Sequence, residues 1–146
     1  MEDTYGYTLE RVPLGGDRVR VLQLVPPSGP SHAPLRQFGK KASNRAAAGK
    51  LFDTLEQVSK VELLTSYKVS GTVKTLDAPI VEVRVPRLTV RAISYNRNGE
   101  DVLVIIDVIE GHKGTGKIPP EAMKNFKGKI DIIEKLLENE NTQPSL

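Results

Sequence analysis

Three β-rich runs follow one another within thirty residues, and this stretch constrains the fold more than any other part of the chain. The runs cover Ile80–Val85, Leu88–Tyr95 and Asp101–Ile109. Pro86 interrupts the chain after the first run, and the sequence Asn96–Gly99 separates the second run from the third. Asn-Gly between β-branched runs is a strong hairpin signal, because both residues tolerate the positive φ of a tight turn. The sequence therefore predicts an antiparallel meander.

Periodic patterns on either side of the meander predict one more strand and two helical regions. Val19–Val25 alternates as a half-buried strand does, and the Pro- and Gly-rich residues 26–30 end it. Residues 35–60 have a helical composition that Asn44 and Gly49 weaken, so either one bent helix or two shorter helices fit. An apolar stripe at threes and fours predicts a last helix over residues 120–138.

These elements predict an α+β domain. We expect a mostly antiparallel, twisted sheet with an N-terminal helical hairpin and a C-terminal helix, the helices packing on one side of the sheet. Residues 1–146 are expected to form a single domain, with a core from about residue 19 to residue 137 and polar ends.

The composition excludes several classes of site. Hydrophobic residues make up 38% of the chain but aromatic residues only 5%, so the core must be aliphatic. The chain has no cysteine and two histidines, which argues against disulfides and zinc, and we expect neither metal nor cofactor. No apolar run is long enough to cross a membrane, and no signal pattern opens the chain, so a cytoplasmic location is expected.

Positive charge is concentrated in the first predicted helical region. The net charge of the chain is only +3, but residues 31–60 carry six lysines and arginines against two acidic residues. Such a segment is either a solvated helix face or a surface for an anionic partner such as nucleic acid or an acidic protein segment.

The meander and its flanks resemble a known family. The sequence T-V-K-T-L-D-A-P-I-V-E-V-R-V at residues 72–85, followed by a strand with Arg91 and Tyr95, is similar to the "K-x-L … Y-E-L-R … Y-R-V-x-Y" core of the RelE/ParE/HigB superfamily. The sequence H-K-G-T-G-K-I-P-P-E-A at residues 112–122 looks like the "F-x-K-K-x-x-K-x-P-x-x-E-I-x-x-A" segment of the phage-derived HigB-like branch. The expected order of one strand, helices, three strands and a helix also agrees with the family.

This resemblance implies the toxin of a type II toxin–antitoxin pair. Its expected activity is metal-independent mRNA cleavage, with or without the ribosome, and its expected partners are mRNA, the ribosome and a cognate antitoxin protein. The alternative is a non-catalytic module on the same scaffold, such as a ParE-like gyrase inhibitor or a drifted phage protein. Fold analogy alone does not separate the two, because function depends on the site.

The resemblance and the chemistry of RNA cleavage together name the candidate residues. A base must remove the 2′-OH proton, cations must stabilise the phosphorane, and an acid must protonate the leaving oxygen. The expected catalytic set is Arg84, His112, Lys113 and Lys117, and the expected RNA- or phosphate-binding set is Arg87, Arg91, Lys40, Lys41 and Arg45. Each has a plainer alternative: Arg84 as a solvent-facing strand residue, Arg91 as a structural partner of Glu82, and the others as ordinary exposed residues.

Overall fold

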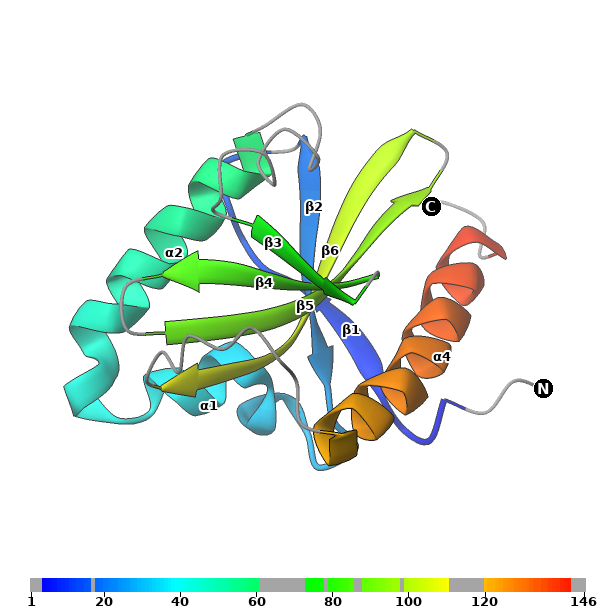
Figure 1. The fold of residues 1–146 in the computed structure, drawn as a ribbon, viewed down its shortest axis with the longest axis horizontal. Coiled ribbons are helices and arrows are strands. Elements are labelled where there is room, and N and C mark those ends of the chain that lie inside the picture. Colours follow the sequence, from blue (N-terminus) through cyan, green and yellow to red (C-terminus); the bar gives the residue numbers. More distant parts are fainter. Residues whose placement is uncertain are drawn as a thin grey trace.

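The structure is a computed structural model that describes residues 4–16, 18–60, 73–77, 79–85, 88–97, 99–110 and 120–142. Figure 1 shows a central sheet with helices on both sides of it. In chain order the elements are β1 (Thr8–Arg11), β2 (Val19–Val25), η1 (Pro30–His32), α1 (Pro34–Gly39), η2 (Ala42–Asn44), α2 (Arg45–Lys60), β3 (Val73–Asp77), β4 (Ile80–Val85), β5 (Leu88–Arg97), β6 (Glu100–Glu110) and α4 (Pro120–Thr142). The α+β class is confirmed.

The six strands of the described residues form one mixed sheet in the order β1-β2-β6-β5-β4-β3. Strand β2 runs parallel to β6, with Val21 opposite Leu103, and the other neighbouring strands pair antiparallel. The predicted strand at Val19–Val25 therefore joins the same sheet as the meander. Parallel strands need a long connection, and here the chain between β2 and β6 includes α1 and α2 as well as the strands β3 to β5.

The predicted hairpin is present between β5 and β6. Arg97 pairs with Glu100, so the turn contains only two residues, the second of which is Gly99. Gly99 has φ +81°, a left-handed conformation that residues with a Cβ seldom adopt. The Asn-Gly signal therefore accounts for the register of the longest strand pair.

Apolar side chains on each face of the sheet are covered by different helices. On one face, Val21, Val83 and Leu103 pack with Leu51 and Leu55 of α2 in a core that also includes residues of α1. We call this the α1/α2 face.

The opposite face is covered by α4, and we call it the α4 face. Leu22, Ile80 and Val104 form its core together with Phe126 and Ile133 of the helix. Burying a side chain of this size stabilises the fold by about 1.5–3 kcal/mol. Of the predicted apolar stripe of the last helix, Phe126, Ile133 and Leu137 are buried and Ile130 is partly buried.

The expectation that the helices pack on one side of the sheet is wrong. Residues Val102–Ile106 of β6 are five consecutive apolar residues, each at most 5% exposed. Successive side chains of a strand point to opposite faces, so a continuous apolar run must be covered on both sides, and this run signals two helical layers.

The expected N-terminal helical hairpin is also wrong, because two strands precede the helices. Strand β1 was not predicted; it pairs with β2 at the edge of the sheet, with Thr8 opposite Val25. The helical region at residues 35–60 consists of two helices, α1 and α2, separated by η2. The amide Nδ2 of Asn44 donates to the carbonyl oxygen of Phe38 at 2.9 Å, which satisfies a carbonyl near the end of α1.

Candidate functional site

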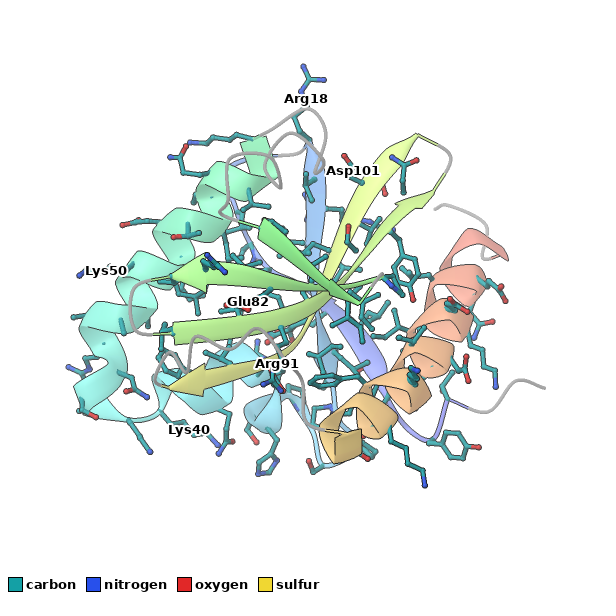
Figure 2. The ribbon with its side chains drawn as sticks, viewed as in Figure 1. Arg18, Lys40, Lys50, Glu82, Arg91 and Asp101 are labelled. Carbon is teal, nitrogen blue, oxygen red and sulfur yellow. The ribbon has the colours of Figure 1, made fainter. Side chains whose placement is uncertain are left out.

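A row of charged residues crosses three strands on the α4 face. Arg91 of β5 lies opposite Glu82 of β4 on one side and opposite Asp107 of β6 on the other. Figure 2 shows Glu82 and Arg91 on the central strands of the sheet, away from its outer edges. A charged row at this position is unusual, because Leu22, Ile80, Val104 and other apolar side chains of this face form a buried core with α4.

A β-bulge places Asp107 in this row. The register between β5 and β6 shifts there, so that Arg91 pairs with Asp107 whereas its neighbour Ala92 pairs with Ile105. Ile106 is the extra residue. Without it, strict alternation from Ile105, which belongs to the α1/α2 core, would direct Asp107 into that core. Bulges are often found beside functional sites because they redirect a side chain in this way.

Arg91 is held by contacts on two sides. Its Nη1 lies 4.0 Å from Oδ2 of Asp107, and its side chain is 16% exposed. Its guanidinium carbon lies 5.4 Å from the centre of the Phe126 ring of α4, a cation–π arrangement. Arg91 therefore connects the sheet to the helix that covers it, in addition to any contact with a ligand.

Asp107 is a half-buried carboxyl with an altered proton affinity. Burial raises the pKa of Asp107 above its ordinary value, while the charges of Arg91 and Lys129 and a backbone hydrogen bond from Arg91 act in the opposite direction. Its Oδ1 atom is buried without a hydrogen-bond partner among the described residues. A carboxylate whose pKa is raised binds a proton more readily than an ordinary aspartate.

Arg84 differs from Arg91 in its exposure. It lies two residues after Glu82 on the same face of β4, and its side chain is 44% exposed, against 5% for Glu82. Its Nε lies 3.9 Å from Oε1 of Glu82, which is an ion-pair distance but too long for a hydrogen bond. The guanidinium is thus oriented by a buried carboxylate and still accessible to a phosphate group.

A cleft lies where α1 meets the end of β6, and we call it the α1–β6 cleft. The last described pair between β2 and β6 joins Gln23 and Ile105, and the residues of β6 that follow border the cleft. The cleft has a volume of about 540 Å³. Its polar lining residues are His32, Gln37, Lys41, Asn44 and Asp107.

The structure brings together only part of the predicted site. Arg84 and Arg91 share the α4 face, and Lys41 lines the cleft that Asp107 also borders. Lys40 lines a different groove, between α1 and β1, and Figure 2 shows it at the end of α1. Arg45 begins α2. The predicted residues His112, Lys113, Lys117 and Arg87 lie outside the described residues.

Sequence reasoning missed Asp107 and Phe126 as neighbours of the candidate arginines. A signal for Asp107 was present, because it is a single charge within the apolar run from Val102 to Ile109. Phe126 gave no comparable signal, since an aromatic residue on a helical stripe is usually a core residue. Its contact with Arg91 depends on how α4 crosses the sheet.

Within the described part of the chain, no group of three or more histidine and acidic residues is placed to hold a metal ion. The helices described there also include none with the length and apolar character that crossing a membrane requires. The sequence matches no family model, and neither a curated protein nor a solved structure matches the chain.

Proposed function

We propose that this protein is the toxin of a type II toxin–antitoxin pair and acts as a metal-independent mRNA endoribonuclease. The proposal rests on the resemblance to the RelE/ParE/HigB superfamily. The observation that carries it is the placement of Arg84 and Arg91 on one face of the sheet, near the end at which Leu88 pairs with Glu110. His112, Lys113 and Lys117 follow Glu110, the last residue of β6, in the sequence.

In this proposal Arg84 stabilises the negative charge that develops on the phosphorane. An arginine suits this role because it remains protonated and binds phosphate oxygens through two donors. His112 or a lysine of the same segment removes the proton of the ribose 2′-OH or protonates the leaving 5′-oxygen. Arg91 is a positioning residue, since Asp107 and Phe126 hold it against the sheet.

The proposed partners are mRNA, the ribosome and an antitoxin protein. RNA binding is favoured by the basic residues of the α1–α2 region, among them Lys40, Lys41 and Arg45. Phosphate contacts of this kind supply most of the sequence-independent affinity for nucleic acid. An acidic segment of an antitoxin can use the same charges.

One observation favours the alternative, a non-catalytic module such as a ParE-like gyrase inhibitor or a drifted phage protein. Each of the two arginines faces a carboxylate: Arg84 faces Glu82 and Arg91 faces Asp107. A nearby carboxylate reduces the positive potential that a phosphorane would meet. The charged row would then stabilise the fold and have no part in catalysis. The exposure of Arg84 is the reason we place the nuclease first.

Expression of the full chain in bacteria tests the proposal. We expect growth arrest with loss of translation, relief by a cognate antitoxin, and no arrest from the Arg84→Ala variant at equal soluble expression. Arg18→Ala is the matched control, because Arg18 is exposed just before β2, whose first residue Val19 pairs with Asp101 at the opposite end of β6 from the level of Arg84. Unimpaired growth with soluble parent protein would contradict the toxin and favour the non-catalytic module.

A further inference from the structure

We propose that the α1–β6 cleft binds a nucleotide of single-stranded RNA beside the phosphate that Arg84 contacts. This inference deepens the proposed function and rests on it. It concerns Lys41, His32 and Gln37, whose side chains come from the segment between β2 and α2. None of these residues belongs to the proposed catalytic set.

The position of the cleft follows from the point at which β2 and β6 stop pairing. Because β2 stops pairing with β6 after Ile105, the edge of β6 from Ile106 to Val108 faces α1, and the cleft is lined by Ile106 from the α4 face and by Val108 from the α1/α2 face. Peptide groups along such an edge are hydrogen-bonding groups that can be offered to a ligand. The volume of about 540 Å³ lies within the range of roughly 300–1,000 Å³ that small-ligand sites occupy.

The lining matches the parts of a nucleotide. Lys41 supplies a positive charge for a phosphate, and the imidazole of His32 can donate or accept a hydrogen bond. The amide of Gln37 offers both donors and an acceptor, which suits the edge of an unpaired base. The half-buried Pro34 provides apolar surface against which a base can lie, beside the largely buried Phe38.

The cleft and the charged row share one residue. Asp107 lines the cleft and also lies within ion-pair distance of Arg91. The positive charge of Arg91 offsets the negative charge of Asp107, which would otherwise repel an approaching phosphate. Arg91 in turn lies opposite Glu82, which stands two residues before Arg84 on the same face of β4. Neighbouring strands are about 4.8 Å apart, so β6 and β4 are separated by only about 10 Å. The row thus leads from the cleft toward Arg84, and a single strand of RNA can contact both in succession.

An RNA strand fits these groups better than a protein segment. The cleft presents five polar residues and one strand edge, whereas an amphipathic peptide helix needs a mainly apolar groove. A surface with a large exposed apolar side chain lies elsewhere, in the groove between α1, α2 and β1, where the exposed Phe52 lies with Val12 and Leu35 beside polar residues such as Glu10 and Lys40.

Direct binding of a short RNA to the purified full chain tests the inference without relying on catalysis. The probe is a fluorescent hexanucleotide with 2′-O-methyl riboses, which lacks the hydroxyl that cleavage requires, and fluorescence anisotropy measures its affinity. We expect Lys41→Glu to weaken binding at least about tenfold and Gln37→Ala to weaken it about threefold. Lys50→Glu, an equal charge change at an exposed position of α2, should cost no more than about twofold.

Three outcomes would overturn the inference. The first is an equal loss of affinity in Lys41→Glu and Lys50→Glu, because only overall charge would then matter. The second is competition by poly-glutamate as strong as that by unlabelled RNA, which would make the cleft a site for acidic protein segments. The third is no binding of the probe by the parent protein. Growth arrest and mRNA cleavage by the parent in any of these cases would leave the proposed function standing.

Discussion

Two arginines on the same face of the sheet have different surroundings, and these surroundings suggest different roles. Arg91 is largely covered, with Phe126 on one side and Asp107 on another. Arg84 is nearly half exposed and has one described ion-pair partner, Glu82, at 3.9 Å. The distinction between a structural and a functional arginine is therefore measurable, because the first affects stability and the second affects activity.

Replacing Arg84 with alanine should remove RNA cleavage and leave the fold intact. Losing one preorganised donor to the transition state costs about 3–4 kcal/mol, or at least about a hundredfold in rate. Losing an exposed strand side chain costs less than about 0.5 kcal/mol of stability. Cleavage assays and melting curves measured on the same preparation check both values.

Arg91→Ala is the comparison that makes this result specific. We expect its melting temperature to fall, because it loses the contact with Phe126 and leaves Asp107 half-buried beside an uncharged side chain. Equal behaviour of the two variants, with both folded and both active, would show that neither arginine contacts the scissile phosphate.

Asp107→Asn should change the pH dependence of stability. The pKa of Asp107 is raised in the folded protein, mainly by burial. A carboxyl whose pKa is higher in the folded protein contributes to stability at a pH below its pKa in the unfolded chain. This contribution is lost as the pH rises through its pKa in the folded protein. The neutral amide of the variant does not titrate. The melting temperature of the variant should therefore rise relative to that of the parent as the pH rises through that range.

Melting curves from acid to neutral pH check this expectation, with Asp53→Asn as the same change at an exposed position of α2. The opposite result is a melting-temperature lead of Asp107→Asn over the parent that grows toward acid pH. It would mean that the ion pair with Arg91 affects the pKa of Asp107 more strongly than burial does.

At the scale of single elements, most of the secondary structure follows from local patterns. The alternation of Val19–Val25 and the Asn-Gly turn led to the correct strands and hairpin. Strand β1 escaped prediction because its four residues, Thr8–Arg11, include two that are charged, and its pairing with β2 is a tertiary contact. Local propensity is weak evidence for a short edge strand.

Two glycines outside the site give a matched pair of stability predictions. A Cβ on Gly16 would lie 2.6 Å from the backbone oxygen of Ser59, at the end of α2, so Gly16→Ala must displace backbone. Gly49 lies within α2 with nothing within 4 Å of an added Cβ, so Gly49→Ala should stabilise the helix by up to about 1 kcal/mol.

Chemical denaturation of both variants checks the pair. We expect the midpoint to fall for Gly16→Ala and to rise for Gly49→Ala. If Gly16→Ala were as stable as the parent, the close packing of the segment before β2 against α2 would be wrong.

At the scale of the whole molecule, the site depends on features that no local pattern carries. The bulge at Ile106 decides which face Asp107 occupies, and the order of strands decides that Arg91 lies between Glu82 and Asp107. Resemblance to a family was enough to single out Arg84 and Arg91, but their carboxylate and aromatic neighbours come from β4, β6 and α4. Such neighbours become visible only when the register and the helix packing are known.

The parallel pairing of β2 with β6 is also a feature of the whole molecule. These strands are far apart in the sequence, with α1, α2 and three strands between them, yet their pairing sets where β6 loses its neighbour and the α1–β6 cleft begins. The cleft was therefore not predictable from the separate patterns of either strand.

The central claim is that this chain cleaves mRNA, and mapping the 5′ ends of a reporter mRNA tests it most directly. The purified protein is added to the mRNA alone and to a translating extract, in parallel with Arg84→Ala and with Arg18→Ala as the control. The account predicts new, metal-independent 5′ ends with the parent and with Arg18→Ala, and at least about a hundredfold fewer with Arg84→Ala. An intact mRNA with and without ribosomes, or equal cleavage by Arg84→Ala, would contradict it.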